Sequence, residues 1–305
     1  ITTTSGLNPT PVAANSSDTG NGGSAADAAY QTTVGLDTSL TGNGWNAGSY
    51  GRGTWNSATD QSVAGATLRI WSHDNFGEDL LINARDSGIF YWDKTDGITA
   101  RAVALSAITN SNLAPTIAKK VLVSDADRHI IAFGCDPETD IGTQDPLLIR
   151  FSSQESLTDW QSLPTNTAGD LRIGSGSEII TAIETRQQVL VFTDKSLHAM
   201  QFIGPPFTFG INAISENITI ASPLAAIAVE DMVFWMGQQE FYVYSGGVQR
   251  LPCTVRDYVF NDFNDKQVEK VTASTNNAFS EVWWFYPSAS SDENDKYVVY
   301  NYQQK

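Results

Sequence analysis

The sequence contains few residues of the kinds that build metal centres, disulfide frameworks or nucleophilic active sites. Its two cysteines, Cys135 and Cys253, match no zinc motif in their spacing, and a disulfide framework would need more of them. We therefore expect free thiols, in a protein assembled in a reducing compartment. The three histidines, His73, His129 and His198, have no second ligand at zinc spacing, so structural roles are expected for them.

Signatures of catalysis are also missing. The chain has no GxSxG, P-loop or HExxH motif, and no GxGxxG followed by a helical pattern. The run SDENDK at 291–296 superficially resembles a calcium loop but lacks the required glycine and glutamate, so we expect a solvated hairpin tip there. The sequence therefore predicts no catalytic residue, no cofactor and no metal, and we expect that the protein is not an enzyme.

Positive charge is scarce. There are 18 basic residues against 34 acidic ones, giving a net charge of −16, and Lys119-Lys120 is the only adjacent basic pair. A protein that binds nucleic acid through its phosphates needs the opposite balance. Two interpretations remain: an acidic surface that keeps the protein soluble, or a surface past which DNA slides without binding.

Long apolar runs are absent. No stretch of 18 or more apolar residues occurs, so no membrane-spanning segment is expected. The chain opens on Ile1, with neither an initiator methionine nor a signal peptide, and ends on a strand-like segment. We interpret it as an internal piece of a longer polypeptide.

Residues 1–65 lack apolar runs and are rich in Gly, Ser, Thr, Asn and Ala. Such a composition buries too little apolar area to offset the entropy of ordering the backbone, so a long irregular N-terminal arm is expected, with a helical turn or two at 25–30. Three aromatic residues, Trp45, Tyr50 and Trp55, lie in its Gly-rich part. They either anchor the arm to a partner or fold back onto their own domain.

Short strands dominate the sequence from residue 66 onward. Residues 66–105 alternate β-branched and aromatic segments with expected turns at Asp74-Asn75, Phe76-Gly77, 86–88 and Asp96-Gly97. Similar units follow, whose second strands centre on Leu81, Ile131, Leu190, Phe234 and Trp284, at steps of 50, 59, 44 and 50 residues. Four-stranded propeller blades repeat at about 40–50 residues.

This repeat predicts an all-β fold, a β-propeller of antiparallel three- to four-stranded blades over residues 66–305. Five blades are visible, and we expect segments outside this sequence to close the ring to about six. The most apolar strands place Phe133, Val191, Phe234 and Trp284 between blades. An interrupted apolar stripe at Val255, Tyr258, Val259 and Phe263 predicts one or two short helices between the fourth and fifth blades.

Four stretches resemble a known family: WSHDNFGEDLLINARDSGIFYWD (71–93), FSSQESLTDWQSLPTNTAGDLRIGSGS (151–177), FWMGQQEFYVYSGGVQRLPCTVRDYVF (234–260) and EVWWFYPSASSDENDKYVVYNY (281–302). They are similar to tail nozzle or hub proteins of short-tailed bacteriophages, which include packaged-DNA stabilisation and tail tubular proteins. The resemblance covers most of residues 66–302.

The resemblance implies a structural virion protein of the tail, assembled in the host cytoplasm. In that family the subunit forms a ring, expected here as a hexamer, below the portal and adaptor. The ring extends the channel through which DNA is ejected, helps to retain the packaged genome and carries tail fibres or spikes. The family has no catalytic residue to carry over, and its DNA passes without specific binding.

A carbohydrate-recognising propeller and a propeller glycosidase are the alternatives. A glycosidase needs two funnel carboxylates roughly 5–10 Å apart. Sialidases add an arginine cluster and Ser-x-Asp-x-Gly-x-x-x-Trp boxes, and no such box is complete here. The arginines whose convergence the sequence leaves open are Arg69, Arg85, Arg101, Arg150, Arg172 and Arg186.

Overall fold

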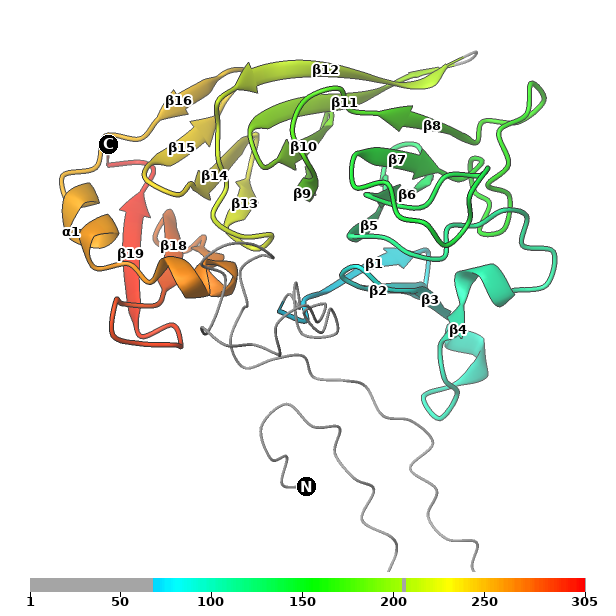
Figure 1. Ribbon diagram of the computed structural model, residues 1–305, viewed down its shortest axis with the longest axis horizontal. Helices are drawn as coiled ribbons and strands as arrows, with labels where there is room; N and C mark the ends of the chain where they lie inside the picture. Colours follow the sequence, from blue (N-terminus) through cyan, green and yellow to red (C-terminus); the bar gives the residue numbers. More distant parts are fainter. Residues whose placement is uncertain (1–67, 205–206, 305) are drawn as a thin grey trace, which may run out of the picture. The chain divides into compact units, whose positions relative to one another are not determined.

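The computed structural model describes residues 68–204 and 207–304, which form five antiparallel sheets (Figure 1). Strands that follow one another in the sequence lie next to one another in each sheet, and the sheets form a five-bladed β-propeller. The all-β fold and the five blades predicted from the repeat are confirmed. Closure to about six blades stays a prediction. The arm at 1–65, the helical turn at 25–30 and the aromatic residues Trp45, Tyr50 and Trp55 lie outside the described residues.

The blades are numbered in chain order. Blade 1 comprises β1 (Trp71–Phe76), β2 (Asp79–Ala84), β3 (Ile89–Trp92) and β4 (Val103–Ala104). Blade 2 comprises β5 (Lys120–Val123), β6 (Ile130–Phe133), β7 (Leu148–Phe151) and β8 (Gly169–Arg172). Blade 3 comprises β9 (Ile179–Glu184), β10 (Val189–Thr193), β11 (Ser196–Gly204) and β12 (Thr208–Glu216). Blade 4 comprises β13 (Ala226–Val229), β14 (Met232–Met236), β15 (Phe241–Tyr244) and β16 (Val248–Arg250). Blade 5 has three strands, β17 (Thr272–Asn276), β18 (Glu281–Tyr286) and β19 (Lys296–Asn301).

Two local expectations for the strands need correction. The turn expected at Asp74-Asn75 is wrong, because β1 continues to Phe76 and Asn75 pairs with Leu80. The carboxylate of Asp74 instead accepts a hydrogen bond from the backbone N–H of Val123 in blade 2, at 2.8 Å. The fourth strand of blade 2, β8, was missed, because its sequence GDLR has one large apolar residue and gives no strand pattern.

The core lies between successive blades, because the second strands are buried on both faces. In β10, Val189 and Val191 pack toward blade 2, whereas Leu190 and Phe192 pack toward blade 4. This explains why such strands are continuous apolar runs without alternation. The four residues predicted to be buried are confirmed: Phe133, Val191, Phe234 and Trp284 are at most 2% exposed.

Short helices connect blades 4 and 5, as the interrupted stripe predicts. They are α1 (Arg256–Asn261) and the 3-10 helix η3 (Asp265–Lys270). Val259 and Phe263 from the stripe are buried, but Tyr258 is 67% exposed, because a helix of six residues presents only a narrow face to the core. Among residues 68–204 and 207–304, no helix has the length and apolar character needed to cross a membrane.

Candidate functional site

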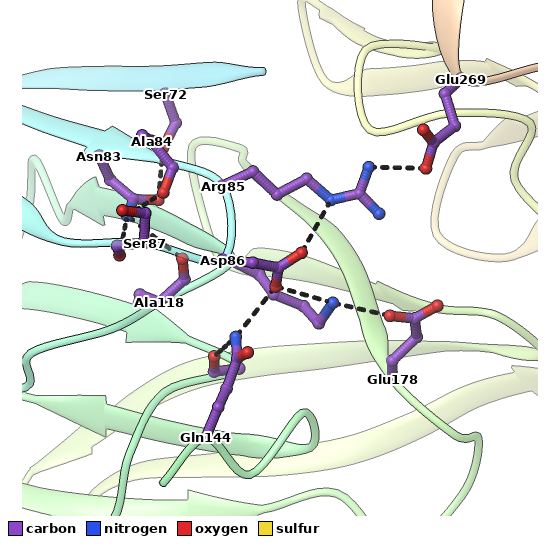
Figure 2. A network of polar contacts seen from close by, with 12 residues as sticks. Ser72, Asn83, Ala84, Arg85, Asp86, Ser87, Ala118, Gln144, Glu178 and Glu269 are labelled. Carbon is purple, nitrogen blue, oxygen red and sulfur yellow. Dashed lines mark hydrogen bonds and ion pairs between the residues drawn. The ribbon is translucent and has the colours of Figure 1, made fainter. Parts of the chain in front are cut away.

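The first strands of the blades bring residues distant in sequence together around the propeller axis. β1 contacts β5, β9 contacts β13, and β13 contacts β17. The turns and loops that lead into these strands therefore meet at one end of the axis. The β2–β3 turn lies at the same end, because Ala84 at the end of β2 pairs with Trp71 at the start of β1. Charged side chains in these segments form the polar network drawn in Figure 2.

Lys119 joins three blades at the centre of this network. It directly precedes β5, and its side chain is 7% exposed. Its Nζ lies 3.1 Å from the carboxylate of Asp86 in the β2–β3 turn and 2.7 Å from that of Glu178, which directly precedes β9. The amide of Gln144 donates a further hydrogen bond to Asp86, at 3.0 Å, so this carboxylate is held from two sides.

Arg85 extends the network from blade 1 to the segment that enters blade 5. Its guanidinium lies 3.0 Å from the carboxylate of Glu269 in η3, and the two side chains are 6% and 20% exposed. Charge-assisted contacts of this length are among the stronger polar contacts in proteins. The first and last blades of the described propeller are thus joined by an ion pair that is largely out of water.

A buried amide fixes the β2–β3 turn from which both charged residues project. Asn83 is fully buried, and its Nδ2 lies within 3.2 Å of the carbonyl oxygens of Ala84, Ser87, Gly88 and Ala118. These contacts join blade 1 to the residue preceding Lys119. The network is therefore positioned by the backbone as well as by its charges.

The arrangement of these charges suits a structural role, in which ion pairs link the blades, better than acid–base catalysis. A glycosidase places its substrate between two carboxylates. Here the ammonium of Lys119 occupies the space between Asp86 and Glu178 and binds both. The two cations are 6% and 7% exposed and the three carboxylates 20–39% exposed, so removing one partner would leave a charge unpaired in a partly buried place.

A second set of side chains completes the inner edge of β5. This edge has backbone N–H groups without a strand partner, which must be satisfied by other groups. Ser72 and Asp74 from β1 accept hydrogen bonds from Val121 and Val123, at 3.3 and 2.8 Å. Glu184 from β9 accepts one from the N–H of Asp125, at 3.0 Å.

Two groups beside this edge have pKa values displaced toward neutrality. Burial lowers the pKa of Lys120 to about 8, although the carboxylate of Asp74 opposes the shift. The Lys120 ammonium donates to the hydroxyl of Thr181, at 3.1 Å. Burial raises the pKa of Glu184 to about 7, against the stabilising N–H of Asp125. These groups change charge near neutral pH, where a displaced pKa makes stability depend on pH.

Two of the three histidines are buried and hydrogen-bonded within the blades. Nε2 of His198 lies 3.0 Å from Oγ of Ser175 and 2.9 Å from Oγ of Ser196, whose hydroxyl also contacts Thr193 at 2.7 Å. Burial lowers the pKa of His198 despite the nearby carboxylate of Glu216. The imidazole and the three hydroxyls satisfy one another, which is a packing role.

His129 is fully buried among aromatic rings. Its ring centroid lies 5.1 Å from that of Phe209 and 6.4 Å from that of Phe151, and its Nε2 lies 3.2 Å from the hydroxyl of Thr167. Burial lowers the pKa of His129, although the charge and backbone of Asp127 oppose the shift. Both buried imidazoles are therefore favoured in their neutral form.

Four of the six arginines that could form a sialidase-type cluster have separate partners. Arg85 pairs with Glu269, Arg172 with Asp145 and Arg186 with Asp231. Arg150 is fully buried and donates to the backbone carbonyls of Leu113, Asp136 and Trp160. These four side chains do not form one anion-binding group.

The remaining sequence candidates were the acidic run at 291–296 and the cysteines. Residues 291–295 lie in the loop between β18 and β19, as expected, and Lys296 begins β19. Lys270 contacts the carbonyl of Asp292 and the carboxylate of Glu293 in this loop. Within the described part of the chain, no group of three His, Cys, Asp or Glu side chains is placed to hold a metal ion. Cys135 and Cys253 are free thiols, the first fully buried.

Sequence reasoning missed the charged network, although one signal pointed to it. Lys119, Glu178 and Glu269 each stand within three residues of the first strand of a blade. A charged residue recurring at that position of the repeat indicates a common location near the axis. The pairing itself could not be foreseen, because Arg85 and Glu269 are 184 residues apart.

Comparison with known proteins gives only distant likenesses. No protein-family model matches the chain, and no curated protein matches it. Similar solved structures include an extracellular domain assigned to a one component system of B. thetaiotaomicron, with 13% identity and a TM-score of 0.46, covering 77% of this chain and 28% of that one. The AfRom2 CNH domain has 13% identity and a TM-score of 0.41, covering 73% and 69% of the two chains. BamB from Moraxella catarrhalis has 12% identity and a TM-score of 0.37, covering 75% and 60%. The chain thus spans less than a third of the length of the first of these proteins, and we infer nothing about function from them.

Proposed function

We propose that this protein is a structural subunit of a bacteriophage tail nozzle or hub, which forms a ring around the DNA channel. The observation that carries the proposal is the resemblance of four stretches of sequence to that family. Three of them, 71–93, 234–260 and 281–302, span consecutive strands of blades 1, 4 and 5. The fourth, 151–177, runs from the end of β7 through β8.

Two physical features support this role. The net charge of −16 repels DNA phosphates and would lower the attraction between DNA in transit and the channel wall. The ion pairs of Lys119 and Arg85 tie blades 1, 2, 3 and the entry to blade 5 together at one end of the axis. Ion pairs between blades would help such a subunit to keep its fold under the internal pressure of a packaged particle.

Electron microscopy of virions would test the proposal. The expected result is density for this propeller in a ring of six copies on the tail axis, below the portal and adaptor. Antibody labelling of a described surface loop, such as the β17–β18 turn, would identify the chain in that ring. Absence of the chain from purified virions would refute the role.

One observation favours the carbohydrate-recognising alternative. A polar cavity of about 220 Å³ lies among the turns of blades 3 and 4. Its lining includes Arg186, Gln188, Asp231 and Tyr244, and Gln188 donates to the Tyr244 hydroxyl at 2.6 Å. Hydrogen-bonding groups beside an aromatic ring suit a sugar. A glycan array probed with the parent chain and with Arg186→Ala would decide: binding that the substitution abolishes favours this alternative.

A further inference from the structure

The hairpin of β11 and β12 carries exposed apolar side chains at its far end. Phe202, Ile203 and Phe207 are 41%, 57% and 72% exposed. Each strand has nine residues, and the hairpin extends past β10 toward blade 2 (Figure 1). Large apolar side chains that stay exposed to water on a projecting hairpin mark an interaction site.

Contacts with blade 2 fix the direction of this hairpin. The hydroxyl of Thr208 donates to the carbonyl of Thr167 at 3.1 Å, and the buried ring of Phe209 packs edge-on against Phe151 at 4.9 Å. These contacts hold the start of β12, at the far end of the hairpin, against blade 2 of its own chain. The side chain of Phe207, directly before Thr208, remains in solvent.

An apolar cavity of about 150 Å³ lies between the outer strands of blades 4 and 5. Trp284 and Phe241 in its lining are buried, at 1% and 2% exposure, and Leu251 and Val298 add aliphatic wall. Val255, directly before α1, also lines the cavity and is 45% exposed. Cavities of about 150 Å³ with apolar walls bind benzene, so this one has the size and lining for a phenyl ring.

The exposed phenyl ring and the cavity belong to different parts of the propeller. The hairpin extends from blade 3 toward blade 2 (Figure 1). The cavity is formed by residues of β15, β19 and the segment before α1, in blades 4 and 5. They can therefore meet only between two copies of the chain. Such a contact uses different patches on the two copies and generates a ring when the rotation closes.

We propose that Phe207 of one copy inserts into the cavity beside Trp284 of a second copy, and that this head-to-tail contact is repeated around the ring. The inference rests on the proposed role as a ring subunit and names the contact that builds the ring. Burying the exposed ring in an apolar cavity removes its surface from water on association. A central aromatic anchor of this kind dominates the affinity of many interfaces.

Sedimentation velocity on the full chain, with two single variants, tests the contact. Phe207→Ser removes the aromatic anchor. Val255→Trp places a bulky indole in the lining of the cavity and so blocks the entry of Phe207. Each variant should weaken self-association by at least about tenfold. Phe279→Ser is the matched control, because Phe279 is 67% exposed in the β17–β18 turn and should leave association unchanged.

Mixing the two variants tests whether the contact runs head to tail. Phe207→Ser keeps an intact cavity, and Val255→Trp keeps an intact anchor. An equimolar mixture therefore contains one functional contact per pair and should form dimers but no larger species. Each variant alone should remain a monomer. Larger assemblies in the mixture would overturn the proposal.

Cys253 provides a readout that does not depend on the substitutions. It lines the cavity, whereas Cys135 is fully buried and serves as an internal control. Alkylation of Cys253 by N-ethylmaleimide should slow on assembly of the parent chain, and prior alkylation of the monomer should block assembly. Equal labelling rates in monomer and assembly would contradict docking in this cavity.

The outcomes separate this contact from the proposed function. Rings that form equally well with Phe207→Ser would refute the contact and leave the ring standing. A parent chain that stays monomeric at every concentration would refute the contact as well. Head-to-tail assembly by a protein that is absent from virions would support the contact and refute the tail role.

Discussion

Replacing Lys119 tests whether the ion-pair network holds the blades together. Lys119→Met keeps the aliphatic stem, which packs over Gly134, but removes the ammonium from between Asp86 and Glu178. Glu178 then loses its cation, and Asp86 keeps only the guanidinium of Arg85, whose Nε lies 3.9 Å away. Breaking a buried ion pair by removing one partner costs about 3–5 kcal/mol.

The expected loss lies at the lower end of that range. The side chains of Asp86 and Glu178 are 27% and 39% exposed, so water compensates part of the lost attraction, and Asp86 keeps its bond from Gln144. We therefore expect Lys119→Met to lower the free energy of unfolding by about 3 kcal/mol. Urea unfolding followed by tryptophan fluorescence measures this difference.

Lys94→Met is the matched control for this measurement. Lys94 pairs with Glu78 at 2.9 Å, but the two side chains are 55% and 79% exposed. An exposed pair contributes about 0–1 kcal/mol, so this variant should be nearly neutral. Equal effects of the two substitutions, or a neutral Lys119→Met, would refute the view that burial makes the network stabilising.

Three further predictions concern the core and the buried titratable groups. Trp284→Ala should lower the free energy of unfolding by about 3–5 kcal/mol, because it removes an indole ring that is 1% exposed together with its hydrogen bond to the Ala225 carbonyl. A melting temperature close to that of the parent would contradict this. Glu184→Gln should leave the free energy of unfolding unchanged at about pH 4 and raise it by about 1–2 kcal/mol at about pH 8. The reason is that ionising the partly buried Glu184 carboxyl destabilises the fold: this effect is absent below the ordinary pKa of a glutamate and complete above the raised pKa of about 7. The opposite pH dependence in urea titrations would exclude this. For His129, whose neutral form is favoured in the fold, stability should fall as the pH drops below about 6.5, and His129→Phe should reduce that loss. His73→Phe, at an exposed position in β1, is the control, and an acid transition that His129→Phe leaves unaltered would refute the assignment.

The strands that the sequence marks most clearly are those buried on both faces. The strand β14 (MVFWM) and the strand β10 (VLVFT) are dense in apolar residues, because each packs against a blade on either side. Their recurrence at 44 to 59 residues was enough to predict a propeller and its blades. By contrast β8 (GDLR), an outer strand, could not be recognised, since its partner β7 supplies the pairing that its own sequence does not indicate.

The sequence by itself determined the repeat, the buried second strands and the short helices between blades 4 and 5, because these follow from local patterns of apolar residues. Only the tertiary structure decided which partners the charged side chains have. Asp74 has the local preference of a turn residue, yet it lies in a strand and caps an N–H group of the next blade. Lys119 meets Glu178, and Arg85 meets Glu269, because the arrangement of the blades around an axis brings the β2–β3 turn and the segments before the first strands to the same end. These paired residues are far apart along the chain, so no local sequence pattern indicates their pairing. Likewise, no local pattern indicates that Phe207 is exposed or that residues of blades 4 and 5 line an apolar cavity.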